Sequence, residues 1–410
     1  MPRLTDSLTL RGRCFLAAGS ALVVCGLVLG FREITRIGVL VGALPLLVGL
    51  IGVRRGLHLR TERTVIPGRV SIDQVSDVVL TVVNEDARPT PILMAEEQVD
   101  YALGDRPRFV IPRLAHGERQ QLPYRVRSNV RGRHRLGPLA LRVKDPFDLS
   151  VRLAVVADVG EVIVLPRVVD LATAGAAAGV GAEGTIPHMV ALHGEDDVSV
   201  REYRDGDDLR RIHWPATARS GELMVRQEDR PSRRRAVIVL DDRDSTGSGP
   251  RSGGSFEWAI TMAASVAALL SRANLSVHLV CGGVVTDAPS DDSFALDNVL
   301  EALAVAELAP PDVFAHSLSV AADRIGDGAM TVAVVGPLAE HETIALARLH
   351  SGGSPALALV MDLAGANSGL AARTADDLRT HGWTSALVAN GTSVPDAWSS
   401  VATSLTAVRR

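Results

Sequence analysis

The densest mixture of charged and aromatic residues lies near the middle of the chain, in the run REYRDGDDLRRIHW at residues 201–214. Guanidinium groups form paired hydrogen bonds with carboxylates, and tryptophan is enriched where protein surfaces bind each other. This charged segment, residues 201–226, is therefore a candidate partner-binding site. Its candidate binding residues are Arg201, Tyr203, Arg204, Asp207, Asp208, Arg210, Arg211, Trp214 and Arg219.

The local pattern predicts how the charged segment is folded. A tight turn is expected at residues 205–206, because Gly tolerates positive φ and Asp bonds its own backbone. Asp207 or Asp208 then caps a short helix by accepting hydrogen bonds from unpaired N–H groups. Pro215 is expected to interrupt that helix, since proline lacks a donor. A strand is expected over residues 222–226.

Two interpretations of the charged segment remain open. As an internal clasp, it is salt-bridged and anchored to the domain that follows by Tyr203, Ile212, Trp214 and Leu223. As a docking surface, its arginines bind carboxylates of a partner and Trp214 is the centre of the interface. Charge does not separate the two, because paired arginines suit either purpose.

The histidines offer a weaker indication of metal chemistry. His188, His193 and His213 lie near three acids, and such groups can bind Zn²⁺. The acids are Glu195, Asp196 and Asp197. The spacing matches no strong zinc template, and no phosphate-binding loop, dinucleotide-binding glycine motif or serine nucleophile motif occurs. The sequence therefore predicts no enzymatic activity.

The charged segment resembles the signature of the bacterial domain-of-unknown-function family 58. Its elements Arg-Glu-Tyr, Gly-Asp-Asp, Arg-x-Ile-x-Trp, Ala-Arg and Leu-Met-Val-Arg occur in order within residues 201–226. A second match lies upstream, with RGRH at 131–134, LGP at 136–138 and DPFDL at 145–149. The resemblance covers about residues 10–400. It implies a membrane protein that accompanies a MoxR-type AAA+ ATPase, often with a transglutaminase-like membrane protein.

The C-terminal part looks like a von Willebrand factor A domain. In its metal-binding form that domain carries Asp-x-Ser-x-Ser after the first strand, where hard oxygens bind Mg²⁺. Here residues 241–245 read DDRDS, so Arg243 replaces the middle serine, and residues 335–337 lack the aspartate of a complete site. A guanidinium opposes a neighbouring cation. We expect a degenerate site at Asp241 and Ser245, with Arg243 in place of the cation and no cofactor; Mg²⁺ is the alternative.

Length and composition limit the class of protein. A chain of 410 residues is too long for one core and predicts two soluble domains with appendages. The net charge of -4 gives no reason to expect nucleic-acid binding. The three cysteines, Cys14, Cys25 and Cys281, lie in apolar runs and form no disulfide or zinc pattern, which fits a reducing compartment.

Two apolar runs predict a transmembrane helical hairpin within residues 1–59, with spans at about 14–30 and 37–53. The alternative, a signal peptide, is disfavoured because no small-residue cleavage site follows and a second run comes at once. Arginines are more numerous outside the two runs than between them. The positive-inside rule then places both termini in the cytoplasm of a two-pass protein of the cell membrane.

Residues 60–168 predict an immunoglobulin-like β-sandwich, because short alternating runs are separated by Pro, Gly and Asp. The runs are 78–83, 92–103, 121–127, 139–143 and 162–165. Nine arginines lie between Arg106 and Arg135. They are interpreted as solvated strand faces, or as a basic face on anionic lipid headgroups.

Residues 169–234 are expected to be an Ala/Gly-rich linker followed by the charged segment, and residues 235–410 an α/β domain. Apolar strands separated by amphipathic helices predict a mostly parallel sheet covered on both faces. The strands are predicted at 236–240, 276–281, 330–335, 356–361 and 385–388. The helices are predicted at 255–272, 294–307, 312–325, 339–350, 372–381 and 395–407.

The prediction for the whole chain is a membrane-anchored, cytoplasm-facing adaptor that binds proteins and the lipid bilayer. A membrane-bound metal-dependent enzyme centred on Asp241 is the alternative. A third hypothesis is a structural membrane protein whose partner lies within the bilayer.

Overall fold

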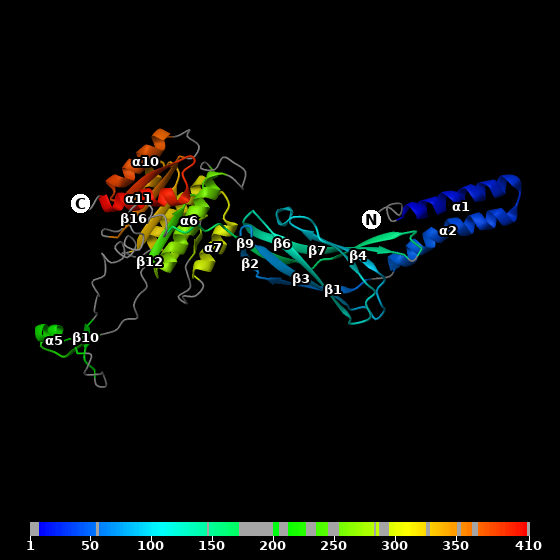
Figure 1. Ribbon diagram of the computed structural model, residues 1–410, viewed down its shortest axis with the longest axis horizontal. Coiled ribbons are helices and arrows are strands. Elements are labelled where there is room, and N and C mark those ends of the chain that lie inside the picture. Colours follow the sequence, from blue (N-terminus) through cyan, green and yellow to red (C-terminus); the bar gives the residue numbers. More distant parts are fainter. Residues whose placement is uncertain are drawn as a thin grey trace. The chain divides into compact units, whose positions relative to one another are not determined.

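The computed structural model describes residues 8–54, 57–145, 147–171, 200–204, 212–226, 235–244, 254–282, 284–286, 295–324, 329–350, 354–362 and 368–407. The chain divides into two compact units, Met1–Leu165 and Pro166–Arg410. Figure 1 shows a helical hairpin and β-sheets in the first unit and a helix-covered sheet in the second.

The first unit begins with two helices, α1 (Leu10–Leu29) and α2 (Arg32–Arg54), which form an antiparallel hairpin (Figure 1). Both are long and apolar enough to cross a membrane, as judged by length and composition. Gly30 ends α1 in the left-handed conformation with φ of 74°. The connection is therefore shorter than predicted, because α2 already starts at Arg32.

Glycines allow α1 and α2 to approach closely. A Cβ atom on Gly19 would lie 2.5 Å from the backbone nitrogen of Gly42, and one on Gly38 would lie 2.7 Å from that of Val23. Helices in membranes are not driven together by burial from water, and small residues at their interface let the backbones approach closely enough to pack. The sequence pattern of the hairpin thus encodes its packing as well as its hydrophobicity.

The rest of the first unit, here called the β domain, contains two sheets. A three-stranded antiparallel sheet has the order β1-β3-β6, and a second has the order β2-β9-β7-β4-β5 with β8 paired to β7. The strands are β1 (Leu59–Ile66), β2 (Arg69–Ser71), β3 (Val75–Asn84), β4 (Leu93–Val99), β5 (Arg108–Ile111), β6 (Arg119–Arg127), β7 (Gly132–Lys144), β8 (Val151–Val156) and β9 (Gly160–Leu165). A short 3₁₀ turn, Tyr101–Leu103, lies between β4 and β5. Both sheets contribute alternating apolar side chains to shared clusters, which include Leu80, Leu93, Leu122 and Leu139.

Cross-strand ion pairs neutralise much of the arginine-rich run that the sequence analysis singled out. Arg108 Nε lies 3.0 Å from Glu96 Oε2, and Arg125 Nε lies 2.9 Å from Asp77 Oδ1. These pairs are exposed and contribute little stability each. They favour the interpretation as solvated strand faces over a basic surface for anionic lipid.

The second unit contains an α/β domain built on one six-stranded sheet with the order β14-β13-β12-β15-β16-β17. All neighbouring strands are parallel except β13 and β14. The strands are β12 (Arg235–Leu240), β13 (Ser276–Cys281), β14 (Val284–Thr286), β15 (Met330–Val335), β16 (Ala356–Asp362) and β17 (Thr384–Ala389). The antiparallel strand β14 was not predicted, because three residues carry too little pattern.

Helices cover both faces of this sheet, as Figure 1 shows. They are α6 (Ser255–Arg272), α7 (Ala295–Val305), α8 (Pro311–Arg324), α9 (Glu340–Ala347), α10 (Ser368–Thr380) and α11 (Val394–Ala407). Alternate residues of β12, such as Val237 and Val239, pack with Phe314 and Leu378 on the face that α8, α9 and α10 cover. The central strands are buried along both sides, which explains their unbroken apolar sequences.

Candidate functional site

The acidic residues after the first strand of the α/β domain lie where expected, at the carboxyl end of β12. The Asp241 backbone N–H donates to Val334 O of β15 at 3.0 Å, which fixes its position beside the neighbouring strand. The Asp241 side chain is fully buried. Its Oδ1 accepts from Arg243 Nε at 2.9 Å, and its Oδ2 accepts from Arg243 Nη2 at 2.7 Å.

Arg243 is itself buried and joins three further parts of the domain. Its Nη1 donates to Glu342 Oε2 of α9 at 2.6 Å, and its Nη2 donates to Pro337 O at 3.0 Å. The guanidinium carbon lies 5.2 Å from the ring centroid of Phe314 in α8. Burial opposes the positive charge, but hydrogen bonds and charge from Asp241 and Glu342 outweigh it and raise the pKa of Arg243.

The Asp241 carboxylate does not fit the role of a metal ligand in this arrangement. Besides the two bonds from the Arg243 side chain, it accepts the backbone N–H of Arg243 at 3.1 Å and that of Gly336 at 2.9 Å. Its accepting positions are thus directed at donors, and a guanidinium occupies the place beside it. Ser245, the other predicted metal ligand, lies outside the described residues.

Asp242, the next residue, is also fully buried but faces β13. Its Oδ2 lies 3.8 Å from the Cys281 sulfur, while its Oδ1 has no hydrogen-bond partner among the described residues. Burial, together with the nearby Asp241 charge, raises the pKa of Asp242 above its ordinary value. Two adjacent carboxyl groups therefore differ in environment, one bound to a cation and the other favouring its neutral form.

The described parts of the charged segment fold onto a short central strand. Strand β10 (Val200–Glu202) pairs antiparallel with β11 (Met224–Arg226). On the other side of β11, Ile212 forms a bridge with Val225, and the His213 N–H donates to Met224 O at 2.8 Å. Val225 is buried at the centre. The fold of the segment thus depends on contacts between its two ends.

The prediction for Pro215 was wrong. Helix α5 (Trp214–Ser220) begins just before this proline instead of ending there. Backbone N–H groups in the first turn of a helix have no acceptor within the helix, so a proline at this position loses no hydrogen bond. His213 caps the helix, and its Nδ1 accepts from the Ala216 N–H at 3.1 Å. Gly221 ends it with φ of 76°. A capping role for His213 differs from the zinc-binding role considered above, whose other residues lie outside the described ranges.

The predicted binding residues are only partly placed. Trp214 is 66% exposed and Leu223 is 43% exposed. Tyr203 is held by its backbone N–H, which donates to Leu223 O at 2.8 Å, and Arg219 lies exposed in the last turn of α5. Arg201 and Arg204 flank this region. The predicted turn and Asp207, Asp208, Arg210 and Arg211 lie outside the described residues.

The comparison with protein families bears on this same segment. Residues 199–349 match the family described as "Protein of unknown function DUF58". The match covers just over a third of the chain and supports the resemblance that the sequence motifs indicated. It extends from β10 to the end of α9, so it includes both the charged segment and the Arg243 site.

No curated protein matches the chain. Among solved structures, the CARDB domain of a Pyrococcus furiosus protein, crystallised with di-metal ions, is 16% identical; 26% of this chain and 91% of that one are covered, with a TM-score of 0.20. The Pseudomonas fluorescens alkylpurine DNA glycosylase AlkC is 14% identical and has a TM-score of 0.18. That match covers 31% of this chain and 39% of the glycosylase chain. The putative ApaA protein from Bordetella pertussis is 10% identical and has a TM-score of 0.21. That match covers 27% of this chain and 94% of the ApaA chain. Likenesses this low carry no argument about function.

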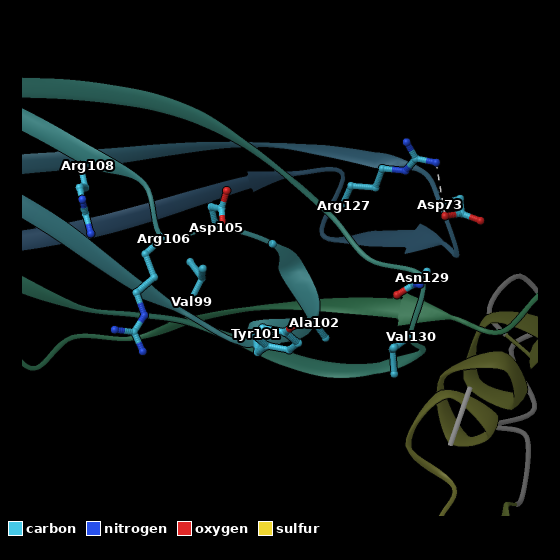
Figure 2. Close-up of a pocket in the computed structure, with 11 residues that line it drawn as sticks. Asp73, Val99, Tyr101, Ala102, Asp105, Arg106, Arg108, Arg127, Asn129 and Val130 are labelled. Atoms are coloured by element: carbon cyan, nitrogen blue, oxygen red, sulfur yellow. Dashed lines mark hydrogen bonds and ion pairs between the residues drawn. The ribbon is translucent and has the colours of Figure 1, made fainter. Parts of the chain in front are cut away.

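A groove of about 1140 Å³ lies in the β domain beside the 3₁₀ turn (Figure 2). Arg127 and Asp73 form an ion pair at 3.4 Å on one side, and Tyr101 lies on the other, almost wholly exposed. Arg106 and Arg108 in its wall both approach Glu96. The lining contains no nucleophile with an adjacent base, and its charges are largely used in pairs.

Sequence reasoning missed the partners that complete the Arg243 site. Glu342 and Phe314 lie far along the chain from Arg243 and follow no motif around it. One local signal was present, since Glu342 occupies the third position of α9, where its Oε2 accepts from the Ala339 N–H at 2.8 Å. That capping position identifies a helix start, not a partner for a distant arginine.

Proposed function

We propose that this protein is a membrane-anchored adaptor that binds other proteins through the charged segment. The single observation that supports the binding role most directly is the exposure of Trp214 on a segment whose described strands pair around the buried Val225. A large aromatic side chain in water, on the same short helix as the exposed Arg219, has the composition of an interface centre. The clasp interpretation requires the indole to be buried.

The rest of the chain supplies the setting for this function. The helices α1 and α2 anchor the protein as a two-pass hairpin, with both termini in the cytoplasm. The β domain is an immunoglobulin-like sandwich and the α/β domain is of the von Willebrand factor A kind, with Arg243 in place of a metal. The proposed partners are those that the family resemblance implies: a MoxR-type AAA+ ATPase and a transglutaminase-like membrane protein, in assembly or envelope-related work.

The alternative, a metal-dependent enzyme centred on Asp241, is less well supported. Both of its carboxylate oxygens already accept hydrogen bonds from Arg243, so a cation would have to displace a buried guanidinium. Titration of the full chain with Mg²⁺ measures this directly. Binding that is lost in Asp241→Ala would favour the enzyme.

Photo-crosslinking in cells tests the adaptor proposal. A photoreactive amino acid is placed at Trp214 and, as the control, at Ile344, an exposed apolar residue of α9. We expect the AAA+ ATPase to be captured from position 214 and not from position 344. Equal capture from both positions, or capture of no AAA+ ATPase from position 214, would refute the proposed docking site.

A further inference from the structure

The DPFDL motif at residues 145–149 has no part in the proposed docking site, yet its described residues, Asp145 and those at 147–149, form a hydrogen-bonded turn between β7 and β8. The Asp145 Oδ1 accepts from the Phe147 N–H at 2.8 Å, and its Oδ2 accepts from the Ser150 N–H. The Asp148 N–H donates to Asp145 O at 3.0 Å, and Asp148 takes a left-handed conformation with φ of 55°. The first aspartate of the motif thus holds the turn, and the second bends it.

This turn contacts the beginning of helix α1. The Thr9 N–H donates to Leu149 O at 3.0 Å, and Leu8 forms a bridge with Ser150. A Cβ atom on Gly12 would lie 2.1 Å from Leu149 O, so the helix approaches the turn at a position that admits only glycine. The Thr9 hydroxyl also caps α1 by accepting the Gly12 N–H at 3.1 Å. The motif therefore fastens the β domain to the first turn of the hairpin.

The charge pattern of α1 places that first turn at the membrane surface. Arg11 and Arg13 immediately precede the uncharged run of residues 14–30, so they lie at the level of the lipid headgroups if α1 crosses the bilayer. The side chain of Phe147 is 62% exposed on the turn that packs there. Leu10, in the same turn of α1, and Ile92, just before β4 at the same end of the β domain, are also exposed apolar residues.

We propose that the described part of this turn, residues 145 and 147–150, rests on the bilayer surface, with Phe147 inserted at the boundary between lipid headgroups and acyl chains. Exposed Phe and Leu side chains of segments that lie on a membrane are buried at this level. The occupant of this exposed apolar site is lipid, since the turn is hydrogen-bonded to the helix that enters the same bilayer. The inference rests on the proposed membrane anchoring and adds a direct contact between the β domain and the lipid surface.

Quenching by brominated lipid tests the proposal in the full chain. Phe147→Trp is reconstituted in phosphatidylcholine vesicles, with or without bromine near the carbonyl end of the acyl chains. The matched control is Tyr101→Trp, an exposed aromatic position displaced by roughly 25 Å along β7 at about 3.3 Å per residue. Emission of the unsubstituted chain, which has four tryptophans, is subtracted. We expect bromine to quench the added emission in Phe147→Trp and to leave that of Tyr101→Trp unchanged.

A third variant separates this proposal from the membrane anchoring on which it rests. Val24 is exposed in the middle of α1, so Val24→Trp should be quenched by bromine placed deep in the acyl chains. If Val24→Trp is quenched and Phe147→Trp behaves like Tyr101→Trp, the contact of Phe147 with lipid is refuted, while the membrane-spanning hairpin is supported. If Val24→Trp is not quenched either, the anchor itself fails. Blue-shifted but unquenched emission from Phe147→Trp would mean that protein covers the site, which also refutes the proposal.

Discussion

Among single residues, Arg243 combines near-complete burial with a permanent charge, and its carboxylate partners come from different elements. Asp241 directly follows β12, and Glu342 lies in the first turn of α9. Taking three charges out of water is costly, and their mutual hydrogen bonds offset that cost only while all three are present. The loop after β12 is therefore fixed by electrostatics as well as by packing.

Replacing Arg243 with alanine should leave both carboxylates buried without their cation. We expect the free energy of unfolding of the α/β domain to fall by about 3–5 kcal/mol. Denaturant unfolding of the full chain in detergent measures the change. The control is Arg272→Ala, which removes an exposed ion pair with Asp170 and should cost less than about 1 kcal/mol. Equal effects would contradict the buried role of Arg243.

Asp242 predicts a pH dependence of stability. Because burial raises its pKa, the folded chain keeps this proton at pH values where the unfolded chain, with the ordinary value of 3.8, has lost it. The contribution of Asp242 to stability is therefore greatest at acid pH and declines as the pH rises from 3.8 through the folded pKa. Asp242→Asn should flatten this decline and raise the unfolding midpoint at neutral pH. Parallel stability profiles for the two proteins would contradict this assignment.

At the scale of elements, the charged segment is a small unit whose strands pair across it, with Trp214 facing outward from α5. Because the indole is exposed, we expect its removal to weaken binding of the proposed partner and to leave folding almost unchanged. Trp214→Ala should change the free energy of unfolding by only about 0.5 kcal/mol. The same variant should lose capture of the partner in a pull-down from solubilised membranes. A large loss of stability would restore the clasp interpretation and weaken the docking site.

For the whole molecule, the proposal that the hairpin crosses a membrane predicts where the other domains are found. Membranes extracted with alkaline carbonate should retain the full chain, whereas a chain starting at Leu57 should be released, because α1 and α2 carry the apolar surface needed for insertion. Release of the full chain would show that the hairpin does not cross the bilayer. A second measurement, protease protection of an epitope after Arg410, reports on which side the C-terminus lies.

Much of the α/β domain could be predicted from sequence because its signals are local. The strands at 276–281 and 330–335 and the helix at 255–272 have the predicted bounds, since unbroken apolar runs and amphipathic periodicity identify them. In the β domain the alternating runs identified β3, β4, β6, β7 and β9. They did not include β1 or β8, and β2 and β5 are too short to show a period.

The candidate sites were less predictable because their partners are distant in sequence. The sequence indicated that Arg243 replaces the cation beside Asp241 but gave no sign of Glu342 or of the contact with Phe314. The DPFDL motif was recognised without a role, since only the fold brings Leu149 against Gly12. Pro215 was predicted to end a helix because, in the sequence alone, a proline that ends one helix looks the same as a proline in the first turn of the next.

The guanidinium at the end of β12 has a consequence for regulation. A divalent ion held by carboxylates leaves when its supply falls or a chelator competes, and the surrounding loop then relaxes. Arg243 is part of the polypeptide and stays charged at any physiological pH, so the loop around Asp241 has no such means of release. Any switching of this protein must therefore enter through another part of the chain or through molecules that bind elsewhere on it.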